Sequence, residues 1–318
     1  MSEYLLEARG ISKEFPAAGK KSVHAVSDVS LQIREGETLG LVGESGCGKS
    51  TLGRLMIRTL KPTSGEIWFR GKNITTMGDK EFMPSRKEMQ LIFQDPYASL
   101  DPRMTVRDLV AEPIETWHLC KGRATVTERV KELLHAVGMP EEFLYRHPHQ
   151  FSGGQRQRIG IARAMAADPA FIVCDEPVSA LDVSVQNQIL NLLKELKSSR
   201  KLTYLFISHD LSVVRYLADR VCVMFLGKIC EIGPTEEVYS HPRHPYTRFL
   251  LDAVPVPDPA SRGKEIRLLE GEPPSPADPP SGCRFRTRCP YATERCAREE
   301  PELRDMEGVQ AACHVPCP

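Results

Sequence analysis

A run of nine residues, GESGCGKST at 43–51, constrains the fold of this chain more than any other feature of its sequence. The run follows the apolar segment 39–42, which predicts a strand, and precedes a helical pattern over 49–60. Glycines at this spacing let backbone N–H groups turn inward around an anion, and the helix N-terminus adds its dipole. The pattern Gly-x-x-x-x-Gly-Lys-Ser/Thr therefore predicts a loop that binds the phosphates of a nucleotide.

Residues within this loop have distinct expected roles. We expect Lys49 to reach the β- and γ-phosphates of the nucleotide and the Ser50 hydroxyl to bind Mg²⁺. Cys47 stands at a variable position, where a small filler is the first interpretation and a redox-sensitive thiol the lesser one. The predicted nucleotide-binding residues are Gly43, Glu44, Ser45, Gly46, Cys47, Gly48, Lys49, Ser50 and Thr51.

Two carboxylates follow a second apolar run. Residues 171–174 predict a strand, and Asp175 and Glu176 stand at its end. Asp175 is positioned to hold Mg²⁺ through water, and Glu176 to polarise the attacking water as a general base. A solvated acidic turn is the alternative interpretation. The phosphate-binding loop in the same chain favours catalysis.

The chain between about residues 4 and 250 alternates strand-like and helix-like segments. Near-continuous apolar runs are typical of parallel strands covered on both faces, so the pattern predicts an α/β core. The first 38 residues and 65–74 instead favour antiparallel strands with a tight turn. The predicted core strands are 39–42, 91–93, 171–174, 204–207 and 221–225. The predicted helices are 49–60, 156–167 and 185–199.

Further polar residues stand at the ends of these elements. Gln94 and His209 follow predicted strands, at the edge that lines the ligand crevice in doubly wound sheets. Each of them is otherwise an ordinary loop residue. A second glycine-rich helix start follows about 100 residues after the first and forms another potential anion site. Its residues are Ser152, Gly153, Gly154 and Gln155.

Composition restricts the classes of function. Lys and Arg number 42, as do Asp and Glu, so the zero net charge argues against a nucleic-acid partner. The sequence has no run of about 18 apolar residues that would span a bilayer, and its N-terminus does not resemble a secretory signal. We expect a cytosolic chain that only a partner would hold at a membrane.

A change in composition predicts three regions. Eight prolines fall between Pro255 and Pro280, which favours an extended connector over a packed element. We expect a nucleotide-binding domain at 4–254, a Pro-rich connector at 255–282 and a Cys-rich C-terminal extension at 283–318.

Taken in chain order, these motifs resemble the ATP-binding cassette family over about residues 4–250. The resemblance adds a D-loop, formed by Ser179, Ala180, Leu181 and Asp182. It implies an ATPase that uses ATP and Mg²⁺. It also implies a RecA-like parallel sheet core, an N-terminal antiparallel β subdomain and a helical subdomain.

The resemblance also assigns roles to individual residues. In the family, two cassettes close head to tail over two ATP molecules, so 152–155 are implied to contact the partner's nucleotide. Gln94 is implied to sense Mg²⁺ and the γ-phosphate, and His209 to be the switch histidine. Phe15 is similar to the aromatic residue that stacks on adenine, with a plain strand-end residue as the alternative. Phe151 replaces the usual leucine and is large enough to pack the helix start.

Segments 94–102 and 244–248 and the Cys-containing tail are similar to ATPase subunits of oligopeptide and dipeptide importers. The similarity is closest to the second ATPase of heteromeric systems. It implies a second ATPase subunit, two membrane-spanning permease subunits and an extracytoplasmic substrate-binding protein, assembled at the inner membrane. This chain would lie on the cytoplasmic face.

Two alternatives to peptide import stay open. Nickel importers share the same features, so nickel or another small solute is the alternative cargo. A soluble cassette ATPase acting on DNA or the ribosome is the other alternative. It is disfavoured because 61–158 has room only for an ordinary helical subdomain and the net charge is zero.

The tail cysteines follow a C-x5-C-x6-C-x16-C spacing, which indicates a metal in a reduced compartment. This spacing differs from the paired C-x2-C of common zinc sites, whereas four thiolates suit a [4Fe–4S] cluster, to which the importer resemblance also points. The alternatives are a Zn2+ site and thiols that bind no metal. His314 and Cys317 lie nearby in the sequence and could replace one of the cysteine ligands. The predicted cluster ligands are Cys283, Cys289, Cys296 and Cys313.

Overall fold

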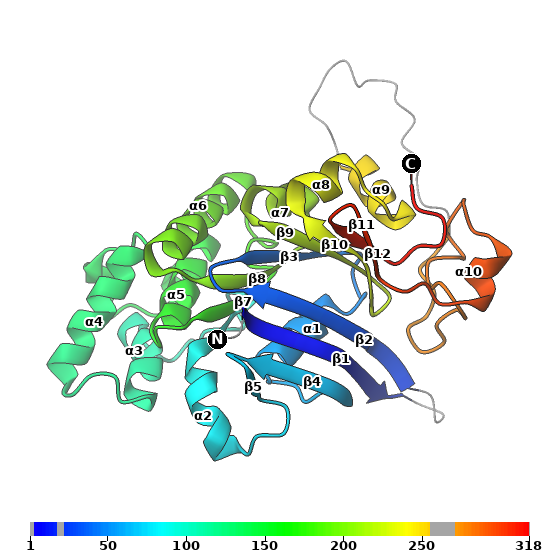
Figure 1. Ribbon diagram of the computed structural model, residues 1–318. Coiled ribbons are helices and arrows are strands. Elements are labelled where there is room, and N and C mark those ends of the chain that lie inside the picture. The colour runs from blue at the N-terminus through cyan, green and yellow to red at the C-terminus, as the bar shows by residue number, and fades with distance from the viewer. Residues whose placement is uncertain (1–2, 18–21, 255–270, 318) are drawn as a thin grey trace. The chain divides into compact units, whose positions relative to one another are not determined.

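The computed structural model (Figure 1) describes residues 3–17, 22–254 and 271–317. The chain divides into two compact units. The first unit comprises Met1–Leu5, Ile33–Glu37 and Thr76–Ile207. The second unit comprises Leu6–Gln32, Thr38–Thr75 and Ser208–Pro318.

The sheet of the first unit contains parallel strands in the order β8-β7-β6. These strands are β6 (Met89–Ile92), β7 (Phe171–Asp175) and β8 (Thr203–Ile207). Every residue of β7 and β8 is buried, which explains why both strands are continuous apolar runs in the sequence. The predicted strands 171–174 and 204–207 are confirmed. The strand predicted at 91–93 is β6, which ends at Ile92, one residue before the predicted end. Phe93 lies beyond the strand and is exposed.

The helices of the first unit follow apolar patterns that face this sheet or one another. Ser152 caps the helix that follows it, which confirms the helix start predicted at 152–155. The helix predicted from residue 185 begins earlier, at Val183, because Asp182 caps it. Short 3-10 turns lie at η2 (Glu141–Phe143) and η3 (Pro148–Gln150). The helices are α2 (Asp79–Glu88), α3 (Val106–Thr116), α4 (Arg123–Ala136), α5 (Gly153–Met165) and α6 (Val183–Arg200).

The second unit contains the parallel pair β3 (Thr38–Val42) and β9 (Arg220–Phe225), both of them predicted. Three strands that the sequence did not predict continue from β9 in antiparallel fashion, in the order β9-β10-β12-β11. They are β10 (Lys228–Pro234), β11 (Arg304–Met306) and β12 (Val309–Ala311). The hairpin formed by β11 and β12 therefore extends the sheet of the second unit.

A four-stranded sheet in the order β2-β1-β4-β5 lies almost entirely in the second unit. Its strands are β1 (Tyr4–Pro16), β2 (Ser22–Arg34), β4 (Ser64–Phe69) and β5 (Lys72–Asn73). The pairs β1–β4 and β4–β5 are antiparallel. Arg70 and Gly71 both have positive φ, which allows the tight turn between β4 and β5. This confirms the antiparallel hairpin predicted at 65–74.

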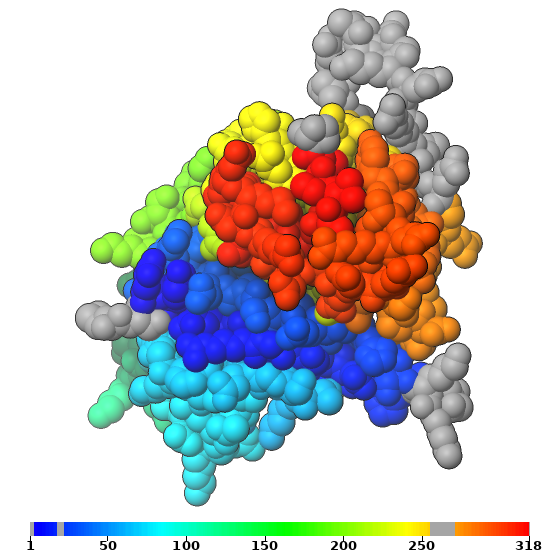
Figure 2. All heavy atoms as spheres, turned by 45° about the vertical axis from the view of Figure 1, so that its right-hand side comes forward, coloured from blue at the N-terminus to red at the C-terminus, as the bar shows by residue number. Residues whose placement is uncertain are grey.

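The helices of the second unit are α1 (Lys49–Met56), α7 (Leu211–Leu217), α8 (Thr235–Ser240), α9 (Pro245–Asp252) and α10 (Glu294–Arg298). The prediction that α1 extends to residue 60 was wrong. Arg58 has a φ of 53°, a left-handed conformation that ends the helix after Met56. Figure 2 shows the orange and red atoms of the C-terminal extension beside the yellow α9.

Residues 255–270 of the predicted connector lie outside the described residues, and 271–282 form neither helix nor strand. The proposed domain boundaries at 254 and 282 therefore stay a prediction. Among residues 3–17, 22–254 and 271–317, no helix has the length and apolar character needed to cross a membrane.

Candidate functional site

The predicted phosphate-binding loop, residues 43–51, joins β3 to α1 in the second unit and requires glycine at two close approaches. A Cβ on Gly43 would lie 2.1 Å from the carbonyl oxygen of Met224. A Cβ on Gly48, which caps α1 with a φ of 104°, would lie 2.1 Å from the carbonyl oxygen of Ala25. The backbone of β9 and of β2 thus presses directly on the loop. Any larger residue at these positions would displace it.

Lys49 begins α1 and is buried, with 5 % of its surface exposed. Its Nζ donates to the carbonyl oxygens of Gly43 at 2.8 Å and Glu44 at 2.9 Å. The ammonium group is therefore held inside the curve of the loop by the loop's own backbone. This is the position from which a lysine can reach bound phosphates.

Cys47 fills space within the loop. Its side chain is buried, and its Sγ lies 3.9 Å from the Lys49 Nζ. Burial raises the pKa of the Cys47 thiol above its ordinary value, although the nearby lysine opposes the shift. Because the thiolate is the reactive form, this environment favours the filler interpretation over redox sensitivity.

His209 lies in the second unit with the phosphate-binding loop. The preceding residue, Ser208, donates its backbone N–H to the carbonyl oxygen of Leu41 at 3.2 Å. This bond places the start of the β8–α7 connection at the carboxyl end of β3, where the loop begins. Asp210 then caps α7 by accepting the N–H of Ser212 at 2.8 Å. His209 is exposed between these two anchored neighbours.

Glu176 and Gln94 come together in the first unit, as their positions after β7 and β6 predict. The Gln94 Nε2 donates to the Glu176 Oε2 at 3.0 Å. Glu176 has a φ of 47°, and its N–H donates to the carbonyl oxygen of Ile207 at 3.0 Å. Left-handed conformations of non-glycine residues are strained and concentrate at functional sites. Asp175, the last residue of β7, is buried with 4 % exposure.

The second glycine-rich segment forms the first turn of α5. The Ser152 Oγ accepts the N–H of Gln155 at 3.4 Å, and the Gln155 Oε1 accepts the N–H of Ser152 at 3.0 Å. This reciprocal pair is a capping box, so both side chains stabilise the start of the helix. A Cβ on Gly154 would lie 2.3 Å from the Val185 Cγ1, so glycine lets α5 approach α6.

The predicted D-loop leads directly into α6. The Asp182 Oδ1 accepts the N–H of Val185 at 3.0 Å and caps that helix. The hydroxyl of Ser184 also donates to Asp182 and lowers the pKa of its carboxyl below the ordinary value. Leu181 lies beside Gly153, where an added Cβ would be 3.3 Å from its Cδ2. The D-loop and the start of α5 are therefore neighbours in the first unit.

Two arginines of α5 hold the loop that follows Gln94. The Arg156 guanidinium lies 3.8 Å from the centre of the Tyr97 ring, and Arg163 donates to the carbonyl oxygen of Ser99 at 2.7 Å. Tyr97 nevertheless leaves 61 % of its surface exposed. The segment 95–99 is thus attached to the helix that begins at the second glycine-rich turn.

Two peripheral predictions concern aromatic side chains. Phe151 is buried and packs edge-on against Phe143 of η2 at a ring distance of 5.3 Å, while its packing on the start of α5 stays a prediction. Phe15 is half-buried, and the Lys13 Nζ lies 5.3 Å from its ring centre. Its stacking on adenine stays a prediction.

The tail cysteines do not form a metal site in the described structure. Among the described residues, no group of three or more His, Cys, Asp or Glu side chains is placed to hold a metal ion. The Cys296 Sγ lies 3.5 Å from the Thr293 hydroxyl. Burial raises the pKa of Cys283 and Cys289, and raises that of Cys313 to about 12. The arrangement of these side chains gives no support to the predicted cluster or to zinc.

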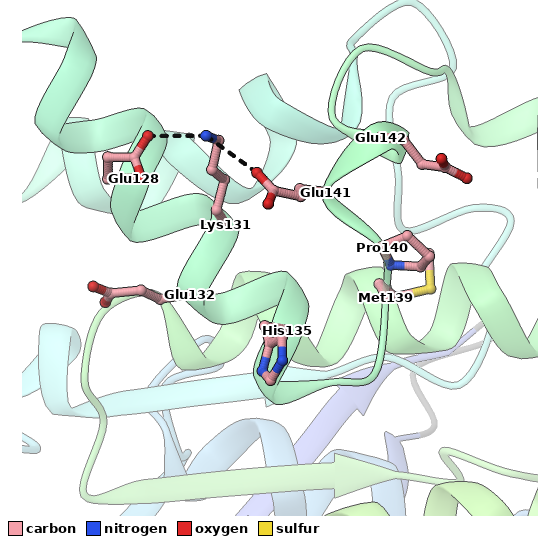
Figure 3. A pocket seen from close by; sticks show the side chains of 8 residues that line it. All are labelled: Glu128, Lys131, Glu132, His135, Met139, Pro140, Glu141 and Glu142. Atoms are coloured by element: carbon pink, nitrogen blue, oxygen red, sulfur yellow. Dashed lines mark ion pairs between the residues drawn. The ribbon is translucent and has the colours of Figure 1, made fainter.

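A hollow of about 730 Å³ lies in the first unit, between α4 and the segment that follows it (Figure 3). Lys131 pairs with Glu128 at 3.0 Å and with Glu141 at 3.1 Å along its rim. None of the motif residues described above lines it. The lining residues are Glu128, Lys131, Glu132, His135, Met139, Pro140, Glu141 and Glu142.

Comparison with known families and solved structures supports the motif assignment. The family model described as "ABC transporter" matches residues 26–179, and "Oligopeptide/dipeptide transporter, C-terminal region" matches 230–296. A solved dimeric structure of the ATP-binding cassette MJ0796, in a post-hydrolysis state with ADP and Pi, has a TM-score of 0.66. It is 29% identical and covers 72% of this chain and 98% of its own.

Curated relatives match almost the whole chain. The putative oligopeptide transport ATP-binding protein YkfD of Bacillus subtilis is 53% identical over 98% of this chain and 95% of its own length. The oligopeptide transport ATP-binding protein OppF of Escherichia coli is 53% identical over 92% of this chain and 88% of its own length. With its phosphate-binding loop, its Gln94–Glu176 pair and its capped glycine-rich helix, this chain is an ATPase that belongs to the ABC transporter family.

Proposed function

We propose that this chain binds and hydrolyses ATP to energise the import of oligopeptides across the cytoplasmic membrane. The observation that carries the proposal is similarity to oligopeptide transport ATP-binding proteins along nearly the full chain. This similarity includes the C-terminal region matched at 230–296, which lies beyond the part shared with ABC transporters in general. Dipeptides are included in the expected cargo because the matched region is described for both classes.

The chemistry we propose assigns one step to each motif residue. In the second unit, Lys49 would bind the β- and γ-phosphates and the Ser50 hydroxyl would be a Mg²⁺ ligand. In the first unit, Asp175 and Gln94 would be Mg²⁺ ligands. Glu176 accepts a proton from the attacking water, and His209 contacts the γ-phosphate as the switch residue. The bond from Gln94 to Glu176 supports this assignment, because it links the proposed metal sensor to the proposed base.

We propose that this chain pairs with a second, different ATPase subunit. The capped turn 152–155 would then contact the nucleotide bound by the partner. The dimeric state of the solved MJ0796 cassette supports the pairing of two cassettes, and the difference between the two subunits rests on the importer resemblance. The two paired ATPase subunits would act on two membrane-spanning permease subunits. In this chain the contact would be made by the segment 95–99, which two arginines of α5 hold in place. An extracytoplasmic substrate-binding protein would deliver the peptide. The chain itself is proposed to lie peripherally on the cytoplasmic face of the membrane.

Uptake of labelled solutes tests the proposed cargo. Cells with and without this chain would be given a panel of labelled dipeptides and oligopeptides, with Ni²⁺ in parallel. We expect peptide uptake to be lost without the chain and restored when it is supplied again, while Ni²⁺ uptake stays unchanged. Loss of Ni²⁺ uptake alone would identify a nickel importer. Unchanged uptake of every solute would contradict a role in this transport and favour a soluble ATPase.

The three-region organisation is proposed with the boundaries 4–254, 255–282 and 283–318. The [4Fe–4S] cluster in the last region stays a hypothesis from spacing and resemblance, since the described side chains do not fit it. Anaerobic purification followed by iron, sulfide and zinc analysis tests it. The hypothesis expects about four iron and four sulfide per chain. Colourless protein with stoichiometric zinc, or with no metal, would refute it.

A further inference from the structure

The phosphate-binding loop carries a negative charge of its own. Glu44, the second residue of the loop, keeps 26 % of its side chain exposed. A carboxylate in a loop that binds phosphates repels its ligand unless a cation compensates it. Lys49 does not take that part, because its ammonium group contacts the carbonyl oxygen of Glu44 and not its carboxylate.

The compensating cation comes from the C-terminal extension. The Arg288 Nη1 lies 3.0 Å from the Glu44 Oε1 and 2.8 Å from its Oε2. The Arg288 side chain is only 7 % exposed, and its Nε has no hydrogen-bond partner among the described residues. A buried guanidinium needs a counter-charge, so each member of this pair depends on the other.

A second contact holds the backbone of the same loop residue. The Tyr246 hydroxyl accepts the N–H of Glu44 at 2.8 Å. Tyr246 is fully buried in α9, and its ring packs at 4.8 Å from Phe225 and 5.3 Å from Phe285. Its hydroxyl is therefore fixed in place by the core of the second unit.

The extension is anchored close to these contacts. Phe285 is 1 % exposed and packs against Phe225 and Tyr246, three residues before Arg288. Arg284 donates to the carbonyl oxygen of Leu226, and the N–H of the next residue, Gly227, donates to the carbonyl oxygen of Cys47 at 2.8 Å. The segment 284–288 thus reaches the phosphate-binding loop both through Glu44 and through the β9–β10 turn.

We propose that Arg288 and Tyr246 are positioning residues for ATP binding, so that the C-terminal extension sets the nucleotide affinity of the phosphate-binding loop. Arg288 neutralises the Glu44 carboxylate and draws it away from the phosphates, while Tyr246 fixes the backbone at the start of the loop. The inference rests on the proposed assignment of 43–51 as the phosphate-binding loop. It gives the His-Pro-Tyr segment at 244–246 a physical role.

Calorimetric titration of the full-length chain with Mg-ATP tests the proposal. We expect Arg288→Ala to weaken binding about tenfold, because an uncompensated Glu44 charge then faces the phosphates. Arg288→Lys keeps the cation and should retain most of the affinity. Tyr246→Phe should weaken binding by about threefold, the effect of one neutral hydrogen bond. The matched control is Arg298→Ala, since Arg298 is exposed and pairs only with the exposed Glu294 among the described residues.

The decisive variant is the double substitution Glu44→Gln with Arg288→Ala. If Arg288 acts by neutralising Glu44, removing both charges restores the affinity to within about threefold of wild type. Wild-type affinity in Arg288→Ala, or a double variant no tighter than Arg288→Ala, overturns the proposal. Should Arg288→Ala not fold, Arg288→Gln alone and with Glu44→Gln gives the same comparison. Lys49→Ala tests the loop assignment separately, because unchanged binding in that variant means that 43–51 is not the phosphate site.

Discussion

Replacing Glu176 with glutamine is expected to lower the rate of ATP hydrolysis by about 10²- to 10⁴-fold, the range that general-base catalysis contributes. Glutamine can still accept a hydrogen bond from Gln94, so the 3.0 Å contact between the two side chains has a close substitute. It cannot accept a proton from water. The variant should therefore bind Mg-ATP and close with its partner subunit, yet fail to hydrolyse and reopen.

Phosphate release from the purified complex measures turnover, and ATP-dependent cross-linking of the two ATPase subunits measures closure. Glu195→Gln is a matched control in the same unit, since Glu195 is exposed on α6. Turnover at the wild-type rate in Glu176→Gln would remove Glu176 from the role of base. Loss of turnover together with loss of ATP-dependent cross-linking would instead indicate a structural defect.

The second large effect is expected in the pH dependence of the free energy of unfolding. His244 is 2 % exposed at the N-terminus of α9, where its Nδ1 accepts the N–H of Tyr246 at 3.1 Å. Burial lowers the pKa of His244 to about 4. Below the ordinary histidine pKa of about 6.5, His244 becomes protonated in the unfolded chain but stays neutral in the folded chain. Stability is therefore lost as the pH falls from about 6.5 to 4, by up to ~3 kcal/mol from this residue.

The variant His244→Asn removes the titration and keeps a residue that caps helices well. Urea unfolding of the full-length chain would be followed between pH 8 and pH 4.5 by the fluorescence of Trp68, in a Trp117→Phe background. Glu231, which accepts the N–H of His244 at 2.9 Å, titrates in the opposite sense because burial raises its pKa. The difference in unfolding free energy between the chains with His244 and with His244→Asn, both in the Trp117→Phe background, isolates the contribution of the histidine. If the unfolding free energies of the two chains depended on pH in the same way, the result would contradict a buried neutral His244.

The central strands and the backbone geometry of residues 43–51 could be predicted from the sequence because their signals are local. A strand buried on both faces must be a continuous apolar run, as β7 and β8 are. The close approach of Met224 to Gly43 leaves no space for a side chain, so the glycine spacing reports the loop geometry directly. Gln94 and Glu176 could be placed together because both follow strands at one edge of the sheet.

The contacts of the C-terminal extension could not be predicted, because they join residues far apart in the chain. Nothing local to Glu44 indicates that its partner is Arg288, 244 positions later. The strands β11 and β12 are three residues each, too short for an alternating pattern to stand out. The only local sequence signal for this hairpin was the dipeptide Glu307-Gly308. Both residues have positive φ at the turn between β11 and β12.

The start of α5 could be predicted because Ser152 is a good N-cap, although two adjacent glycines at 153–154 lower helix propensity. In the structure, the capping box of Ser152 and Gln155 and the tight contact between Gly154 and Val185 outweigh that preference. Tertiary packing decided the boundary.

Uptake of a labelled oligopeptide, in cells whose only copy of this chain is wild type or Glu176→Gln, tests most directly whether ATP hydrolysis by this chain energises import. The two proteins would be compared at equal abundance, with Glu195→Gln as the control. We predict uptake at the background level for Glu176→Gln and at the wild-type level for Glu195→Gln. Wild-type peptide uptake by the Glu176→Gln cells would contradict the claim that ATP hydrolysis by this chain energises import.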